Sequence, residues 1–231
     1  MSAITSAEWT AILLSLRVAV VATLVATPFG IALAWLLARR DFWGKSVLDA
    51  LVHLPLVLPP VVTGYLLLLT FGRRGLVGGF LADYLGIVFA FRWTGAALAC
   101  GIMSFPLLVR PIRLSIEAID RRLEQAAETL GAAPWEVFLT VTMPLALPGV
   151  LAGMVLGFAK AIGEFGATIT FVSNIPGETQ TISSAIYSLI QTPDGDAAAG
   201  RLVIISIVLA LGALIAAEWF ARRATARLHG N

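Results

Sequence analysis

Charge is scarce in this sequence. Asp, Glu, Lys and Arg make up 13% of its 231 residues, whereas soluble domains average about 25%. Hydrophobic residues reach 58% and fall in blocks of roughly 20, the length of a helix that crosses a bilayer. This composition excludes a soluble core of this size and makes lipid the main solvent. The formal net charge is only +2, so we expect no nucleic-acid partner.

Reactive and metal-binding residues are also few. Cys100 is the single cysteine and lies in an apolar run, so no internal disulfide can form and the thiol is interpreted as buried and inert. The two histidines, His53 and His229, lack partners that would indicate a metal site, and we expect no metal. The predicted spans contain no pair of nucleophile and base, so no catalytic residue is expected. Residues 1–9 carry no Lys or Arg and precede a long block, which we interpret as a retained anchor.

A nucleotide-binding motif is missing as well. Gly44-Lys45-Ser46 matches the end of a P-loop, but a P-loop needs another glycine five residues before Gly44. That position is Arg39, so the glycine-rich cradle for phosphates is absent. Any ATP that drives this protein must therefore be hydrolysed on a separate subunit.

Five apolar blocks are long enough to span a membrane. We predict an all-α, polytopic integral membrane protein with a single transmembrane domain over residues 1–231. The predicted spans cover about 11–37, 54–71, 93–110, 145–165 and 202–220. A sixth apolar stretch, Ile182–Ile190, has only nine residues and is placed at the membrane interface or in a re-entrant loop.

Basic residues predict the orientation of the spans. An odd number of spans puts the termini on opposite sides, and the cytoplasmic side carries the excess of Lys and Arg. Ten basic residues flank the spans on one side and four on the other, although Arg73 and Arg74 lie on the minority side. We therefore expect a periplasmic N-terminus, a cytoplasmic C-terminus and a cytoplasmic loop over 114–144, between the third and fourth spans.

That loop has the pattern of a helix–turn–helix elbow. Apolar residues recur at helical spacing at Ile119, Leu123, Ala126, Ala127 and Leu130. Asp120 can cap the first helix, and Gly131 stands where a left-handed C-terminal cap needs glycine. Pro134 can open a second short helix over about 135–141, and Pro144 leads back into the membrane.

The loop resembles the EAA loop, which marks permease subunits of binding-protein-dependent ABC importers. The family pattern is Glu-Ala-Ala, three residues, glycine, nine residues, then Ile-x-Leu-Pro. This chain keeps the spacing, with Gln125 in place of Glu, Val141 in place of Ile and Met143 in place of Leu. The resemblance implies a coupling helix that docks on an ATP-binding subunit through Glu124, Gln125, Ala126, Ala127, Gly131 and Pro144.

The loop has two alternative interpretations. An ordinary loop helix with an alanine face would share the Ala-Ala-x-x-x-Gly pattern but not the spacing to Pro144. A DNA-binding helix–turn–helix is disfavoured because the segment from Arg110 to Pro144 holds four basic and five acidic residues.

A wider resemblance covers nearly the whole chain. Residues 53–60, 163–168, 174–179 and 190–193 look like the permeases of molybdate importers, and sulfate and tungstate permeases share weaker versions. The resemblance implies inward movement of molybdate across a bacterial inner membrane by alternating access. It also implies a second copy of the chain, a dimer of ABC subunits that holds ATP and Mg²⁺, and a periplasmic molybdate-binding protein. Tungstate or sulfate transport is the alternative.

Several residues are candidates for the pathway or gate. Pro59 and Pro60 either line a pathway or simply kink the second span. Glu164 is one helical turn from Lys160, and because a carboxylate repels a dianion, a gate latch or structural pair suits it better than a ligand role. Thr168 and Thr170 offer hydroxyl donors that a tetrahedral oxyanion could use.

Glycines recur every four residues in the fourth span, at Gly149, Gly153 and Gly157. Such a ridge favours close helix packing, within the subunit or across a dimer, over lining of the pore.

Two other functional classes remain as alternatives. A proton-coupled secondary transporter predicts more buried acids than Glu164 and often an internal repeat, which the sequence lacks. An intramembrane enzyme predicts a catalytic pair or metal cluster within the spans. Dependence on a partner ATPase distinguishes the importer from both.

Overall fold

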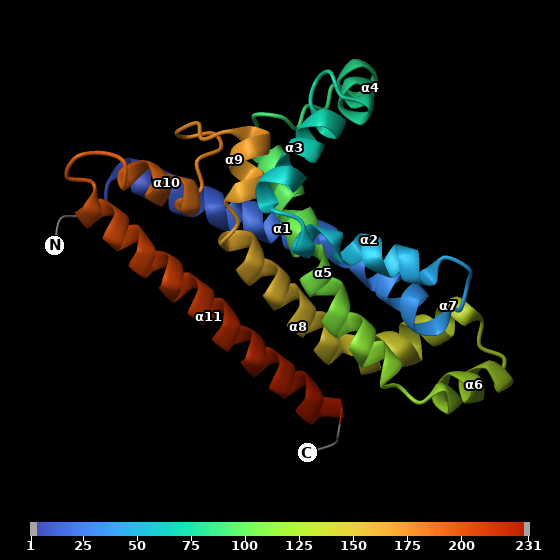
Figure 1. Cartoon of the computed structure of the whole chain (residues 1–231). Coiled ribbons are helices and arrows are strands. Elements are labelled where there is room, and N and C mark those ends of the chain that lie inside the picture. The colour runs from blue at the N-terminus through green and yellow to red at the C-terminus, as the bar shows by residue number, and fades with distance from the viewer. Residues whose placement is uncertain (1–3, 229–231) are drawn as a thin grey trace.

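Helices are the regular secondary structure of residues 4–228, the part that the computed structural model describes. Side chains are described up to Ala216 and again at Trp219. The predicted all-α class is confirmed, and Figure 1 shows the arrangement. In chain order the α-helices and the π-helical turn η1 are α1 (Ser6–Arg39), α2 (Lys45–Val57), α3 (Pro60–Phe71), α4 (Leu76–Leu85), α5 (Trp93–Glu117), α6 (Arg121–Thr129), α7 (Pro134–Val137), η1 (Phe138–Thr142), α8 (Met143–Ile162), α9 (Gly166–Val172), α10 (Ile182–Leu189) and α11 (Asp196–Leu228).

Four of the described helices are long and apolar enough to cross a membrane: Ser6–Arg39, Trp93–Glu117, Pro134–Ile162 and Asp196–Ala216. Helices α2 and α3 add a fifth crossing if they are counted as one broken span. The predicted blocks 11–37, 93–110 and 202–220 lie within α1, α5 and α11.

The predicted span 54–71 is divided in the structure. Helix α2 ends at Val57, α3 begins at Pro60, and the two are bent by 114°. Leu58 and Pro59 have extended backbone, with ψ of 143° and 133°. A residue that precedes proline avoids the helical conformation, and proline has no N–H to continue the hydrogen-bond ladder. The prolines therefore break the helix.

The fourth predicted span, 145–165, also needs correction. The helix begins at Pro134 and continues through η1 into α8, so the expected short helix over 135–141 is not separate. The N–H of Met143 bonds to the carbonyl of Phe138, five residues back, and this π turn lets the helix continue up to Pro144, which has no N–H to donate. At the other end α8 stops at Ile162, and a new helix, α9, begins at Gly166.

Two short helices complete the fold. Helix α4 is absent from the sequence-based prediction because its ten residues are too short for a span, and it projects away from the long helices (Figure 1). Helix α10 corresponds to the apolar stretch at 182–190 and packs against α1. There the Ile182 N–H donates to the Ser15 hydroxyl at 2.7 Å.

Helix α5 lies at the centre of the fold, with α1 and α8 packed against it (Figure 1). The glycine ridge of α8 makes one of these contacts. A Cβ on Gly153 would lie 2.5 Å from the Leu108 carbonyl oxygen, and one on Gly149 would lie 2.7 Å from the Pro111 carbonyl oxygen. A Cβ on Gly157 would lie an ordinary 3.6 Å from Leu108. The ridge thus faces α5 of the same chain.

Candidate functional site

The candidate coupling elbow is formed by α6, the turn at Gly131 and α7. As predicted, Asp120 caps α6, since its Oδ1 accepts from the Arg122 N–H at 2.9 Å. Gly131 has a φ of +92°, a left-handed conformation that glycine adopts without a Cβ clash. The Ala132 N–H then bonds back to the Ala127 carbonyl at 3.1 Å and closes the turn. Local chemistry thus dictates the elbow.

One face of α6 is apolar and exposed. Leu123 is 51% exposed and Leu130 is 89% exposed, and Ala126 between them is also exposed. These residues are three or four positions apart, so they share a face of the helix. Gln125 is exposed and Ala127 is half-buried. Small side chains between two leucines allow another surface to approach the helix closely.

Glu124 lies on a different side of α6 and has partners within the chain. Its carboxylate oxygens lie 3.1 and 3.0 Å from Nε of Arg39, at the end of α1. Its Oε1 also accepts from the Thr142 hydroxyl at 2.6 Å. The two charged side chains are largely buried, with 8% of Arg39 and 15% of Glu124 exposed. Glu124 therefore joins three segments that are distant in sequence.

The π turn sets the position of Thr142 in this group. Thr142 is 1% exposed and closes η1, immediately before α8 begins. Arg39 adds a bond from Nη2 to the Ile119 carbonyl at 3.3 Å, just before the cap of α6. Sequence reasoning found Glu124 but missed Arg39 and Thr142. No local signal in the sequence links these residues, because Arg39 is 85 positions from Glu124.

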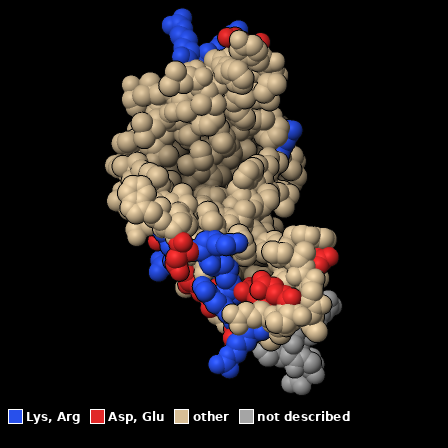
Figure 2. Space-filling model, turned by 90° about the vertical axis from the view of Figure 1, so that its right-hand side faces the viewer, with Lys and Arg blue, Asp and Glu red and all other residues tan. Residues whose placement is uncertain are grey.

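Charged side chains gather at the end of the molecule that holds the elbow (Figure 2). A smaller group lies at the opposite end, and the broad belt between them is almost free of charge in this view. Helices α1, α2 and α5 also enclose an apolar groove of about 630 Å³, in which Thr94 is the polar lining residue. This distribution suits a molecule whose middle contacts lipid or other apolar helices.

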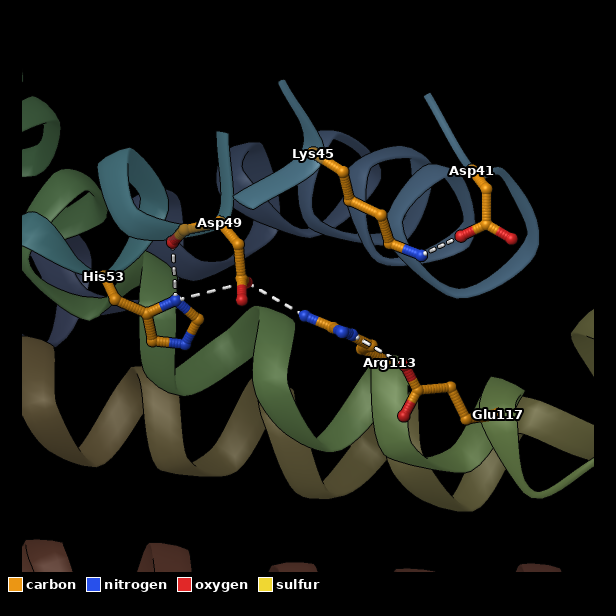
Figure 3. Close-up of polar contacts among 6 residues, drawn as sticks. All are labelled: Asp41, Lys45, Asp49, His53, Arg113 and Glu117. Carbon is orange, nitrogen blue, oxygen red and sulfur yellow. Dashed lines mark hydrogen bonds and ion pairs between the residues drawn. The ribbon is translucent and has the colours of Figure 1, made fainter. Parts of the chain in front are cut away.

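A second ionic cluster pins α2 to α5 near the same end (Figure 3). Arg113 bonds to Asp49 of α2 at 2.9 Å and to Glu117 at 2.8 Å. His53 Nδ1 lies 2.8 Å from the Asp49 carbonyl oxygen, so this histidine is engaged in α2. Asp41 pairs with Lys45 at 2.8 Å, and that hydrogen bond lowers the pKa of the Asp41 carboxyl. His229 lies outside the described residues.

Glu164 lies in the break between α8 and α9 and is 1% exposed. Its Oε2 lies 2.7 Å from Nζ of Lys160, and its Oε1 accepts from the Ala167 N–H at 3.0 Å. The carboxylate thus neutralises the lysine and caps the start of α9. This geometry agrees with a structural pair or a latch.

The two threonines of α9 use their hydroxyl protons on the backbone. Thr168 donates to the Phe165 carbonyl at 2.8 Å, and Thr170 donates to the Gly166 carbonyl at 2.8 Å. In this conformation both hydroxyl protons are bonded to carbonyls, and a role of the two threonines toward an oxyanion stays a prediction.

The two helix breaks meet in space. A Cβ on Gly166 would lie 2.7 Å from Cβ of Pro60, and one on Gly64 would lie 2.5 Å from the Ala167 carbonyl oxygen. Helices α3 and α9 therefore pack at close range, with Pro60 against the start of α9. Residues that the sequence singled out separately, Pro59 and Pro60 in one block and Glu164 in another, belong to one region.

Known proteins resemble this chain over nearly its full length. The molybdenum transport system permease protein ModB of Escherichia coli (strain K12) is 62% identical over 219 residues, which cover 95% of this chain and 96% of that protein. The protein of the same name from Haemophilus influenzae is 57% identical over 225 residues, 97% of this chain and 98% of that protein.

Solved structures share the fold. One is a chain of a bacterial alginate ABC transporter, solved in complex with an alginate pentasaccharide-bound periplasmic protein. It superposes with a TM-score of 0.75 at 20% identity, and the match covers 96% of this chain and 80% of that chain. A chain of the inward-facing MetNI methionine ABC transporter gives a TM-score of 0.69 at 13% identity, over 94% of this chain and 93% of that chain.

The family model for the binding-protein-dependent transport system inner membrane component matches residues 26–226, which include the broken helices, the elbow and most of α11. Together with the close relatives, this match shows that the chain is a member of that family of inner-membrane transport components.

Proposed function

We propose that this chain is the permease subunit of an ATP-driven importer that moves molybdate inward across the bacterial inner membrane. The observation that carries the proposal is 62% identity, over nearly the full length of both chains, to a permease protein of a molybdenum transport system. The fold supports the class independently, because chains of ABC transporters superpose on more than nine-tenths of this one.

The elbow is the proposed docking site for a separate ATP-binding subunit. Its support is the exposed face of Leu123, Ala126 and Leu130, which suits insertion of a short helix into an apolar groove. Gln125, Ala127 and Gly131 complete this surface and its turn, and Pro144 ends the motif. ATP and Mg²⁺ would bind to the partner, because this chain has Arg39 where a P-loop needs glycine.

The proposed orientation puts the elbow in the cytoplasm, with a periplasmic N-terminus and a cytoplasmic C-terminus. Arg39, Arg121 and Arg113 lie at the elbow end, in keeping with the excess of basic residues on the cytoplasmic side. The opposite end would then receive molybdate from a periplasmic binding protein. A second copy of the chain would complete the pathway.

The region where the two helix breaks meet is the proposed gate. Irregular backbone is tolerated at membrane depth where protein or a water-filled cavity covers it, and transporters place substrate sites at such breaks. Pro60 packs on Gly166 here, and Glu164 is neutralised by Lys160. A dianion passing this region would meet a compensated pair. Selectivity would then rest mainly on the binding protein.

Sulfate is the second candidate substrate. A probable sulfate transport system permease protein from Chlorella vulgaris is 35% identical over 203 residues, 87% of this chain and 76% of that protein. The much higher identity to the molybdenum permeases favours molybdate.

The test is uptake of molybdate into vesicles that contain this chain, its ATPase and the binding protein, with sulfate as competitor. Uptake that needs ATP and survives excess sulfate is the expected result. Uptake that needs ATP but is lost to sulfate would move the substrate to sulfate. Uptake that ignores ATP would overturn the importer assignment in favour of a secondary transporter.

A further inference from the structure

An elbow that docks on a moving partner must be mechanically joined to the rest of the permease. The chain itself joins α6 to α5 through residues 118–120 and to α7 through residues 130–133. The second connection contains Gly131 in the left-handed conformation, a turn held by two backbone hydrogen bonds. Side chains that form a bonded bridge from α6 directly to other helices would give its movement a further connection, besides these two backbone segments.

Glu124 makes such a bridge. Its carboxylate accepts a hydrogen bond from Nε of Arg39 at 3.0–3.1 Å and another from the Thr142 hydroxyl at 2.6 Å. These bonds connect α6 to the end of α1 and to the turn that precedes α8. Arg39 also reaches the Ile119 carbonyl, and Arg121 of α6 reaches the Ala38 carbonyl at 3.5 Å. These two additional bonds also hold the end of α1 against the start of α6.

The bridge and the exposed apolar face of Leu123, Ala126 and Leu130 use different sides of α6, while the half-buried Ala127 lies on the side of Glu124. In an α-helix each residue turns by about 100°, so Glu124 lies about a quarter turn from Leu123 and farther from Ala126. A partner that covers the leucine face leaves Glu124 bonded to its own chain. The low exposure of the pair, 8% and 15%, agrees with an internal joint.

The far end of the bridge lies at an irregular turn of the helix. Thr142 is the last residue of η1, and π turns inside α-helices are rare and often mark functional sites. A pull on Thr142 acts on this turn at the entrance to α8, and a pull on Arg39 acts on α1. The Glu124 carboxylate therefore contacts both α1 and the segment that leads into α8, the two long helices that flank α5.

We propose that Glu124 is a positioning residue that transmits movement of the docked elbow to α1 and α8 through Arg39 and Thr142, and is not itself a docking contact. This inference rests on the proposed coupling function. Removing the carboxylate would leave Arg39 largely buried without its partner and would free α6 from α8. ATP hydrolysis would then continue, but less molybdate would be moved for each ATP hydrolysed.

The test uses the reconstituted complex of permease, ATPase and binding protein, with Glu124→Ala, Thr142→Val and the double variant. Three quantities are measured: ATPase retained on the tagged permease, ATP hydrolysed, and molybdate moved per ATP. We expect retention and hydrolysis within about twofold of the wild type and molybdate per ATP about tenfold lower in Glu124→Ala, as loss of charge-assisted bonds predicts. The double variant should be no worse than Glu124→Ala, because both changes break one joint.

Glu128→Ala is the matched control. Glu128 lies one turn farther along α6, is exposed, and is bonded only through its backbone within residues 4–228. Its replacement should leave molybdate per ATP unchanged. Equal losses in Glu124→Ala and Glu128→Ala would overturn the inference.

Other outcomes separate this inference from the function on which it rests. Loss of the ATPase from Glu124→Ala would make Glu124 a docking contact. If Glu124→Ala fails to insert, Thr142→Val decides alone: normal molybdate per ATP would contradict the joint, and a selective fall would support it. If the wild-type permease retains no ATPase, the proposed function itself fails.

Discussion

Replacing Gly153 with alanine should push α8 away from α5. The new Cβ would lie 2.5 Å from the Leu108 carbonyl oxygen, whereas Cβ atoms stay at least 3.0 Å and ordinarily 3.4 Å from such an atom, so the two must move apart by about 0.5–0.9 Å. The obstacle is backbone, which cannot rotate aside as a flexible side chain could. Overpacking of this kind costs about 1–3 kcal/mol.

Gly157 provides a control on the same ridge. A Cβ there meets Leu108 at 3.6 Å, an ordinary contact, and alanine stabilises a helix by about 0.5–1 kcal/mol relative to glycine. The two variants carry the same substitution in the same helix, so their difference isolates the steric term. We expect Gly157→Ala to be at least as stable as the wild type and Gly153→Ala to be less stable by about 1–3 kcal/mol.

The assay is thermal unfolding of the purified protein in detergent, monitored as loss of the monodisperse species. Equilibrium unfolding in a denaturing detergent is the second measurement. Gly153→Ala should unfold at lower temperature than Gly157→Ala. Equal stability of the two variants would refute the close contact between α8 and α5.

Three further predictions concern the elbow, the gate and the core. Gly131→Leu forces a side chain into a φ of +92°, at about 1–2 kcal/mol, and should abolish transport and weaken ATPase retention while membrane insertion persists; normal transport would reject the elbow as the docking site. Glu164→Gln keeps the bond to Ala167 but leaves Lys160 uncompensated, so transport rate should fall with little change in preference between molybdate and sulfate, and a clean switch of preference would show that Glu164 contacts the substrate. Cys100 is 1% exposed, so a maleimide should label it only after unfolding; rapid labelling of the folded protein would contradict its burial.

The elbow could be predicted from sequence because local chemistry determines it. Asp120 caps the helix that follows it directly, and Gly131 satisfies a conformation that its own backbone requires. Such signals act over a few residues and are visible in any single sequence. The proposed docking function of the segment rests on the family resemblance, because its chemistry alone leaves open a docking helix and an ordinary loop.

The joint at Glu124 could not be predicted in this way. Arg39 precedes Glu124 by 85 residues, and periodicity carries no information about contacts at that separation. The π turn was also hidden, since Pro144 indicates a disturbance but not the register that the helix adopts around it. Prolines likewise marked the break after α2, whereas the packing of Pro60 on Gly166 depends on the whole fold.

The hydroxyl groups of Thr168 and Thr170 follow a local rule. Threonine in a helix commonly donates to a carbonyl one turn back, and both residues do so here. That rule can be applied to the sequence alone, and it predicts that neither hydroxyl proton is available to a ligand while α9 keeps this conformation. An oxyanion in the gate must therefore find donors elsewhere, or wait for a conformation in which α9 is rearranged.

The proposed joint and the proposed gate lie at the two ends of one helix. The segment Pro134–Ile162 has 29 residues, which at 1.5 Å per residue makes a rod of about 43 Å. Glu124 bonds near its first end through Thr142, and Glu164 lies just beyond its last residue, in the break that packs near Pro60. The glycine ridge holds the middle of this rod against α5, because Gly149 and Gly153 leave no room for a Cβ there. In the proposed cycle, Glu124 passes the movement of the docked elbow to Thr142, and one continuous helix then carries that movement to the break at Glu164.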